Sequence, residues 1–322
     1  MQHEPETSAT GQQMRDNFGD TLAAAVRAKG NPVVVGLDPR FEQLPAPCRG
    51  NCQPGDRAGQ ADAYRLFCEG VIDAVRGLVP AVKPQAAFFE QLGPHGMSAL
   101  AAVVGYARRA GLLVLMDGKR NDIGSTATAY AQAYLGPDSA WQADALTVSP
   151  YLGEDSIAPF FDACSTSGAG IFVLVKTSNP GGGQFQDLAA AGQPVYRHVA
   201  EQVERLAQAG TGPSGYGFVG AVVGATYPGQ LAELRAAMPH AWILVPGYGS
   251  QGGTARDVAA GFDGAGLGAI VNNSRGIIFA HARREYSQQF GEARWQSAVE
   301  AATLDMIQQL RAETPAGHLS PL

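Results

Sequence analysis

The sequence alternates regularly between short apolar runs and helix-like segments, and this pattern limits the fold more than any other feature. Each run is short, is rich in Val, Leu, Ile and Ala, and is bounded by Gly, Pro or polar residues. Such runs are typical of strands buried on both faces of a parallel sheet. The runs span residues 33–38, 79–83, 112–116, 143–148, 170–175, 218–223, 241–245 and 268–271.

Eight strand–helix units in one chain predict an α/β fold whose strands close into a (β/α)₈ TIM barrel. One extra helix is expected before the first strand, over residues 16–29, with Gly30 as its stop signal. The other helices are expected at residues 60–78, 88–91, 96–110, 122–135, 155–163, 194–209, 228–237, 253–260 and 293–312.

The same pattern predicts one catalytic domain, a TIM barrel over residues 12–314. Residues 1–11 are expected to be disordered, and the polar residues 315–322 are expected to form a loose tail.

The overall charge argues against two classes of partner. Lys and Arg number 23 against 29 Asp and Glu, a formal net charge of −6, which disfavours nucleic acid and anionic membranes. No run approaches the roughly 18 apolar residues of a membrane span, and the polar, acidic start of the chain does not resemble a signal peptide. We therefore expect a cytoplasmic protein. Cys48 and Cys52 lack the further Cys or His ligands of a zinc site.

Charged residues follow the strands at their carboxyl ends, which is where ligands bind in a parallel barrel. Asp38 follows the first strand, Lys83 the second, and Asp117 and Lys119 the third. Buried charges are costly unless they are paired, so the pattern predicts an alternating array of Lys and Asp. Taken alone, Asp122 would be explained by capping a helix, Asp38 by opening a turn and Lys83 by a solvated strand end.

The last two strands are followed by features of a phosphate site. A glycine-rich loop spans 247–253, and Arg275 follows the eighth strand. Loops at these positions of a TIM barrel often bind phosphate through backbone N–H groups. Gln251 adds an amide donor and Arg275 a guanidinium. The sequence therefore predicts a small phosphorylated substrate, although the loop could instead be merely flexible and Arg275 could bind a carboxylate.

The run Asp117-x-Lys119-x-x-Asp122-Ile123, with Thr126, resembles the signature of the orotidine 5′-phosphate decarboxylase family, in particular its longer bacterial subgroup (type 2). The resemblance covers residues 16–310. It is supported by further segments at the other strand ends, namely 36–39, Lys83, 176–181, 224–226, 246–253 and 274–275.

This resemblance implies decarboxylation of orotidine 5′-monophosphate (OMP) to uridine 5′-monophosphate (UMP) in pyrimidine biosynthesis, with neither cofactor nor metal. Lys119 would donate a proton to C6 as CO₂ leaves, and Asp117 would lie beside the substrate carboxylate. Lys83 and Asp122 would complete the array. A fixed ammonium at the reacting carbon would stabilise charge where it develops.

The resemblance also implies how substrate is held. Asp38 would bind a ribose hydroxyl and Ser178 the pyrimidine, while Gln251 and Arg275 would hold the phosphate. Asp122, Ile123 and Thr126 would reach into the site of a second subunit, so that the active unit is a homodimer with shared sites.

Two alternatives remain open at this point. A sister barrel, such as a 3-keto-gulonate-phosphate decarboxylase or a hexulose-phosphate synthase, shares D-x-K-x-x-D but uses Mg²⁺, which needs further carboxylates. Lys83 stands where such a site would favour an acid. The other alternative is a non-catalytic barrel that binds phosphosugars or nucleotides. Against it, a binder has little need of Asp117 close to an anionic ligand.

Overall fold

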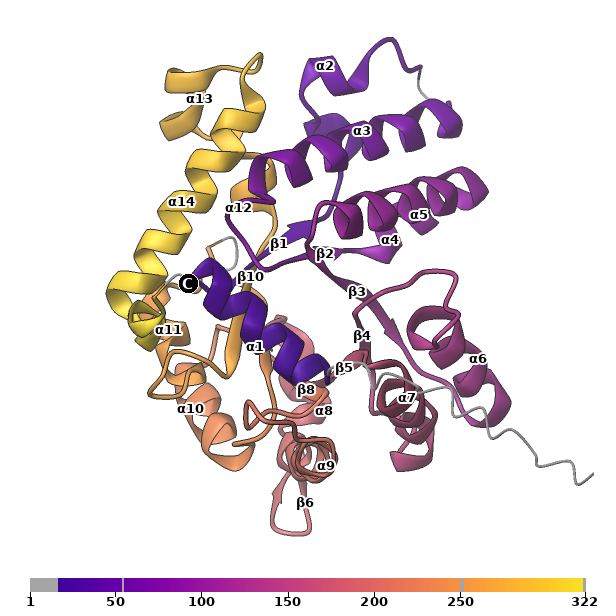
Figure 1. Ribbon diagram of the computed structural model, residues 1–322, viewed down its shortest axis with the longest axis vertical. Helices are drawn as coiled ribbons and strands as arrows, with labels where there is room; N and C mark the ends of the chain where they lie inside the picture. The colour runs from indigo at the N-terminus through magenta and orange to yellow at the C-terminus, as the bar shows by residue number, and fades with distance from the viewer. Residues whose placement is uncertain (1–16, 54, 250–251, 321–322) are drawn as a thin grey trace, which may run out of the picture.

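The computed structural model describes residues 17–320 except 54 and 250–251. Within these residues, eight parallel strands close into a barrel in the order β1-β10-β9-β8-β5-β4-β3-β2 (Figure 1). The predicted TIM barrel is thereby confirmed. The strands are β1 (Val33–Leu37), β2 (Ala81–Pro84), β3 (Leu113–Arg120), β4 (Ala145–Val148), β5 (Gly170–Lys176), β8 (Val219–Val223), β9 (Ile243–Val245) and β10 (Ala269–Asn273).

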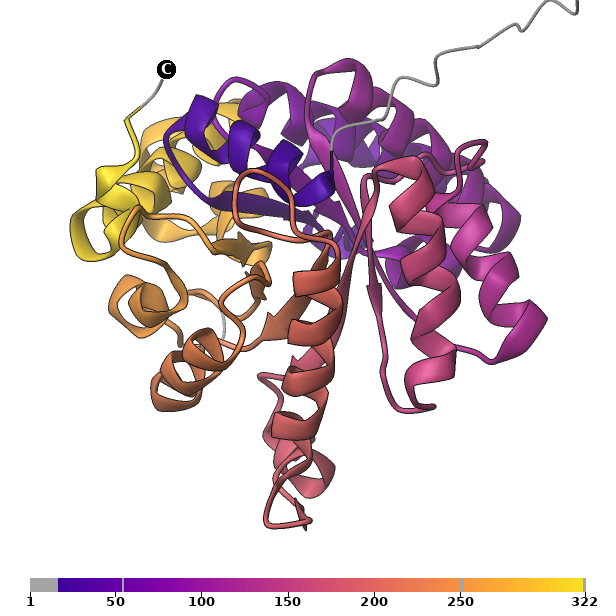
Figure 2. The ribbon, with the colours of Figure 1, turned by 60° about the horizontal axis from the view of Figure 1, so that its bottom comes forward.

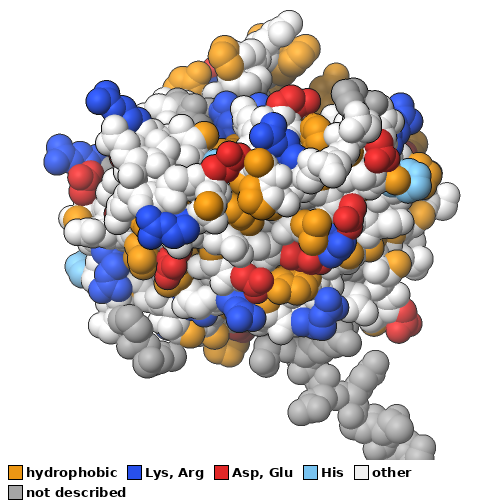
Figure 3. Space-filling model, turned by 90° about the horizontal axis from the view of Figure 1, so that it is seen from above, with side chains coloured by type: hydrophobic (Ala, Val, Ile, Leu, Met, Phe, Trp, Pro, Cys, Tyr) orange, Lys and Arg blue, Asp and Glu red, His pale blue; other side chains and the backbone are white. Residues whose placement is uncertain are grey.

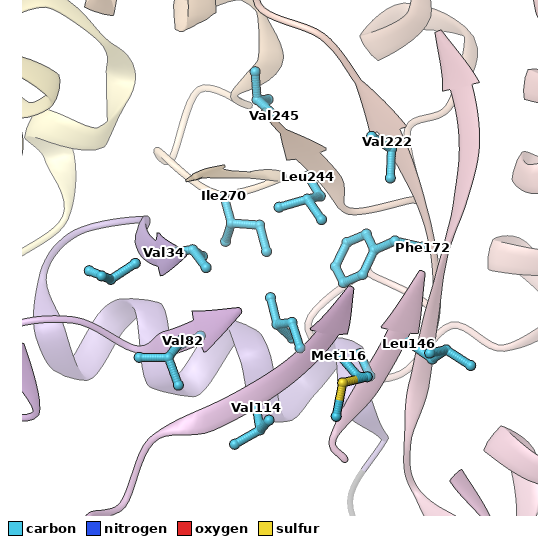
Figure 4. Packing of buried hydrophobic residues seen from close by; sticks show 14 of the residues in the cluster. Val34, Val82, Val114, Met116, Leu146, Phe172, Val222, Leu244, Val245 and Ile270 are labelled. Carbon is cyan, nitrogen blue, oxygen red and sulfur yellow. The ribbon is translucent and has the colours of Figure 1, made fainter. Parts of the chain in front are cut away.

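Helices surround the barrel and bury the outer face of its strands. The inner faces are buried by one another: Figure 4 shows side chains from several strands, among them Leu244, Phe172 and Ile270, packed together inside the ring of strands. Most strand residues are therefore apolar and buried on both faces. The helices are α1 (Phe18–Lys29), α2 (Ala46–Arg49), α3 (Arg57–Val75), α4 (Ala86–Glu90), α5 (Gly93–Arg109), α6 (Gly124–Leu135), α7 (Glu154–Ser167), α8 (Gly183–Gln186), α9 (Val195–Ala209), α10 (Pro228–Ala237), α11 (Ala255–Val258), α12 (Arg275–Ile278), α13 (Arg284–Phe290) and α14 (Trp295–Glu313).

The predicted N-terminal helix is present as α1 and covers the amino end of the barrel. Its Phe18 lies edge-on to Phe172 of β5, with ring centroids 6.0 Å apart. A Cβ on Gly170 would lie 2.2 Å from the Phe18 ring, so only glycine permits this close packing. In Figure 2, α1 lies at one end of the molecule and the β6–β7 hairpin (β6, Ala189–Ala190; β7, Gln193–Pro194) projects at the other. The hairpin follows β5 in the chain, so it projects from the carboxyl end of the barrel, opposite α1.

Several details differ from the sequence predictions. Helix α6 begins at Gly124 rather than at Asp122, so Asp122 lies in the preceding loop. The predicted loose tail is wrong as far as residue 320, because Pro315–His318 form the 3₁₀ helix η5, with Ala316 and Leu319 buried. The short elements α2, α12, α13 and the β6–β7 hairpin were not predicted. Residues 1–11 lie outside the described part of the chain.

Two further features concern the surface and the helices. In the view of Figure 3, acidic and basic side chains are interspersed, without a broad field of one sign. Over the described residues, no helix combines the length and the apolar character that crossing a membrane requires.

Candidate active site

The strand register brings the predicted charged residues to one end of the barrel. Lys83 of β2 pairs with Gly36 of β1, and Val35 pairs with Asn273 of β10. A further bridge joins Gln85 to Asp117 of β3. Because these strands are parallel, their carboxyl ends lie side by side. Lys83, Asp117 and the start of α12 at Arg275 therefore share the open mouth of the barrel.

Asp117 lies between two lysines at this mouth. Its Oδ2 is 2.6 Å from Lys83 Nζ, and its Oδ1 is 2.6 Å from Lys119 Nζ. The Lys83 and Asp117 side chains are only 5% and 9% exposed, whereas that of Lys119 is 48% exposed. The predicted alternating array is thus formed within one chain by these three residues. Lys119 is the member whose amine can be reached from solvent.

The array fixes the charge state of its buried members. Burial by itself would raise the pKa of Asp117, but Lys83 and Lys119 together hold that pKa well below its ordinary value. Burial would likewise lower the pKa of Lys83, yet Asp117 and Asp38 raise it above the ordinary value. At neutral pH the site therefore contains the ionised Asp117 carboxylate paired with the buried Lys83 ammonium.

Thr147 on β4 connects two members of the array and was missed in the sequence analysis. Its hydroxyl donates to Asp117 Oδ1 at 3.0 Å and accepts a hydrogen bond from the Lys119 backbone N–H at 2.9 Å. The residue is almost completely buried. A hydroxyl within the apolar run 143–148 was the available signal, but threonine is common in strands, so the signal is weak.

The backbone at Lys119 is unusual. Between Met116 and Arg120 the pairing of β3 with β4 shifts: Met116 pairs with Leu146 and Arg120 with Val148. Arg120 is four residues beyond Met116 in β3, whereas Val148 is only two residues beyond Leu146 in β4. The extra residues of β3, within 117–119, form a bulge. Lys119 has a φ of +46°, in the left-handed region that side chains rarely adopt. Bulges of this kind redirect side chains next to active sites, and here the bulge turns the Lys119 amine back toward Asp117.

Asp38 lies at the end of β1 and is close enough to Lys83 to influence its pKa. Its Oδ1 is buried and has no hydrogen-bond partner among the described residues. A buried carboxyl oxygen in this state can accept a hydrogen bond from a ligand hydroxyl at little further cost, since its desolvation is already complete. This geometry suits the role that the sequence resemblance implies.

Arg275, one of the two predicted phosphate ligands, borders a cavity of about 460 Å³. Arg275 is exposed at the first turn of α12, and Tyr248, Gly249 and Asn273 line the same cavity. Gly249 has a φ of +69°, a conformation that glycine adopts without strain. Gln251, the other predicted phosphate ligand, lies outside the described residues.

Ser178 follows β5 at the same end of the barrel and is half-buried. A Cβ on Gly224 would lie 2.7 Å from the Ser178 Cβ, so the absence of a side chain there allows this segment to approach β8. The neighbouring Thr177 is held by Gln186 of α8, whose amide accepts from the Thr177 N–H at 3.0 Å. The loop that carries Ser178 is therefore anchored at the mouth.

Three of the predicted residues do not join the array within this chain. The Asp122 carboxylate accepts a hydrogen bond from the Ile123 N–H at 2.8 Å. Ile123 and Thr126 are exposed, and Ile123 is 56% exposed despite its apolar side chain. They lie at and just before the start of α6.

Comparisons with known proteins agree with this geometry. Residues 31–290 match the family described as orotidine 5′-phosphate decarboxylase / HUMPS. A protein named orotidine 5′-phosphate decarboxylase from Rhodopirellula baltica is 59% identical over 298 residues, 91% of this chain and 99% of the relative. One from Deinococcus radiodurans, with the same name, is 42% identical over 271 residues, 83% and 91% of the two chains.

A solved structure shares the fold as well as the sequence. The structure of Leishmania donovani OMP decarboxylase matches with a TM-score of 0.71 and 33% identity, covering 92% of this chain and 98% of that one. The eight-stranded barrel, the array at its mouth and these matches lead to one assignment: the chain belongs to the orotidine 5′-phosphate decarboxylase / HUMPS family.

Proposed function

We propose that the protein decarboxylates OMP to UMP and CO₂ in pyrimidine biosynthesis. The observation that carries this proposal is the array in which Asp117 lies 2.6 Å from the amines of both Lys83 and Lys119. The relatives that share the fold and most of the chain have names that state this activity. The chemistry that follows is argued from this chain's own residues.

Lys119 is the proton donor in this proposal. The bond between C6 of the pyrimidine and its carboxylate breaks, the electron pair stays on C6, and CO₂ leaves. The Lys119 amine then transfers a proton to C6, which yields UMP and a neutral amine that takes up a proton again from solvent. An ammonium held at C6 stabilises the charge that develops there in the transition state. Its partial exposure gives it access to both the substrate and water.

Asp117 acts on the substrate carboxylate through charge. The two lysines keep it ionised, and Thr147 fixes its orientation. A carboxylate held against the carboxylate of OMP disfavours the bound substrate relative to a transition state in which that charge is leaving. Lys83 keeps the buried Asp117 paired and lies near Asp38, where it can also contact ribose.

Binding energy comes from the other end of the substrate. Arg275 holds the 5′-phosphate beside the cavity of about 460 Å³, and Gln251, which lies outside the described residues, is the second phosphate ligand in this proposal. Asp38 accepts a ribose hydroxyl and Ser178 bonds the pyrimidine. These groups lie away from the reacting carbon, and binding at such remote positions can be used to lower the barrier of the chemical step.

The active unit in this proposal is a homodimer with shared sites. Apolar side chains are exposed on two neighbouring loops beside the array: Ile123 is 56%, Tyr151 79% and Leu152 43% exposed. A second copy of the chain that packs against this surface would bury these side chains. Asp122, Ile123 and Thr126 of each subunit would then reach the barrel mouth of the other subunit. The cytoplasmic location expected from the sequence stays a prediction.

The description of the matching family also names HUMPS. The Mg²⁺-dependent alternative from the sequence analysis, a barrel of the hexulose-phosphate synthase type, belongs to that branch. A buried ammonium at Lys83 is a poor neighbour for a divalent cation, since like charges repel, and this favours the OMP decarboxylase.

An ultraviolet assay of OMP disappearance in the presence of a chelator tests the proposal. Turnover should persist in the wild type and should be nearly abolished in Lys119→Ala. Wild-type turnover that stops on chelation would favour the Mg²⁺-dependent branch, and full activity of Lys119→Ala would remove its role as proton donor.

A further inference from the structure

The peptide unit between Gly118 and Lys119 is held from both of its polar ends. Its N–H donates to Thr147 Oγ1 at 2.9 Å, and its carbonyl oxygen accepts from Arg120 Nη1 at 3.0 Å. The orientation of this peptide plane relative to the Lys119 Cα defines φ of Lys119, which is +46°. The two hydrogen bonds therefore stabilise the backbone rotation that directs the catalytic amine.

Arg120 is itself fixed by the helices on either side of β3. Its Nη2 donates to the Glu90 carboxylate of α4 and to the Tyr134 hydroxyl of α6, the latter at 3.1 Å. The guanidinium also lies over the rings of Tyr130 and Tyr134, 5.8 and 5.6 Å from their centroids. A planar guanidinium can bond and stack at the same time, which an ammonium cannot. The donor to Gly118 is thus preorganised.

The Lys119 side chain has little other support. It is 48% exposed, and Asp117 is the one carboxylate with which its amine pairs within the described residues. Asp117 must also face the substrate carboxylate during the proposed reaction. The direction of the amine at that moment depends on the backbone, and a conformation with positive φ persists only where its surroundings enforce it.

We propose that Arg120 is a positioning residue for this reaction: through the Gly118 carbonyl it holds Lys119 in the left-handed conformation that aims the amine at C6. The inference rests on the proposed role of Lys119. Arg120 acts only through the peptide that it binds, and Glu90, Tyr130 and Tyr134 act only through Arg120.

The test compares Arg120→Met with Arg65→Met in the full-length enzyme. Arg65 is the matched control, since its guanidinium also forms ion pairs with carboxylates, those of Asp62 and Glu69, but within the surface of α3. Misplacing a reacting group by about 1 Å costs on the order of 10²-fold in rate, so kcat of Arg120→Met should fall about 10- to 100-fold. Because phosphate and ribose contacts are untouched, KM should change much less. Arg65→Met should keep both constants.

Chemical rescue separates positioning from a merely structural role. Guanidinium ions, at concentrations far below those that unfold proteins, should restore part of the kcat of Arg120→Ala by occupying the space between Gly118, Glu90 and Tyr134. They should not raise kcat of Arg65→Ala or of Lys119→Ala. If the Arg120 variants fold poorly, Tyr134→Phe provides the milder change and should lower kcat with KM retained.

A lowered melting temperature with kcat per folded enzyme close to wild type would overturn the inference, as would absence of rescue in a folded Arg120→Ala. The role of Lys119 is tested separately: if Lys119→Ala keeps the wild-type rate, the proposed proton donor is wrong. If Lys119→Ala is inactive while Arg120→Met has normal kcat, the inference about Arg120 alone fails.

Discussion

Lys83 and Asp117 form a buried ion pair across β2 and β3, with Nζ and Oδ2 2.6 Å apart and less than a tenth of either side chain exposed. Neither charged group is in contact with bulk water, so each needs the other to offset the cost of burying its charge. Asp117 has a second partner in Lys119, and Lys83 has a second acid nearby in Asp38. The energetic coupling within this group gives the first two predictions.

Replacing Asp117 with Asn should destabilise the protein as well as inactivate it. The change leaves Lys83 buried without its carboxylate partner, and breaking a buried pair in this way costs about 3–5 kcal/mol. Urea unfolding measures the loss. Asp62→Asn is the control, because its pair with Arg65 is largely exposed and should contribute no more than about 1 kcal/mol. An equal loss in the two variants would show that Lys83 does not depend on Asp117.

The contribution of Asp117 should disappear in acid. Its pKa is lower in the folded protein than in the unfolded chain, so the unfolded state binds more protons between the two values. The stabilisation is therefore complete above the ordinary carboxyl pKa, about 4, and is lost as the pH falls below it. The difference in unfolding free energy between wild type and Asp117→Asn should stay constant near neutrality and shrink below about pH 4. A difference that grows on acidification contradicts this account.

Thr147→Val should reduce activity with little change in shape. The substitution removes the hydroxyl that donates to Asp117 and accepts from the Lys119 N–H, and leaving such a buried donor unsatisfied costs about 1–3 kcal/mol. We expect kcat to fall about tenfold, which corresponds to roughly 1.4 kcal/mol in the barrier. Thr147→Ser retains the hydroxyl and should recover most of the rate. Steady-state kinetics of both variants, beside their unfolding curves, provide the measurement.

Arg275→Ala should weaken the binding of phosphorylated ligand. A hydrogen bond to a charged group contributes about 1.5–3 kcal/mol, so Kd for UMP should rise about 10- to 100-fold. Uridine lacks the phosphate, and its affinity should not change. Arg205→Ala is the control, since Arg205 of α9 forms an exposed ion pair with Glu154 of α7. Titration calorimetry with both ligands makes the comparison, and equal losses for UMP and uridine would remove the phosphate assignment.

The barrel and the core of the array could be predicted from sequence for the same physical reason. Strands buried on both faces appear in the sequence as continuous apolar runs. Charged residues at the ends of such runs, such as Lys83 and Asp117, are therefore easy to recognise. Thr147 does not stand out, because a threonine in a strand costs little and serves many purposes. The bulge at Lys119 depends on the register between β3 and β4, which neither strand encodes alone.

Helix starts were less predictable. Asp122 has the residue type of an N-cap, yet its carboxylate bonds the N–H of Ile123, and α6 begins later. The tail illustrates a related difficulty. Its composition is polar, but Ala316 and Leu319 are buried against the rest of the fold. Both cases depend on tertiary contacts that a local pattern does not contain.

Mixing two inactive variants tests whether sites are shared between subunits. If Lys119 of one subunit and Asp122 of its partner serve the same site, a mixed dimer of Lys119→Ala and Asp122→Ala has one doubly altered site and one intact site. Random exchange makes half of the dimers mixed, so activity should return to about a quarter of wild type. Lys119→Ala mixed with Asp117→Ala is the control: these two residues bond within one chain, so both sites of the mixed dimer stay defective. Recovery in neither mixture would place Asp122 in its own subunit's site.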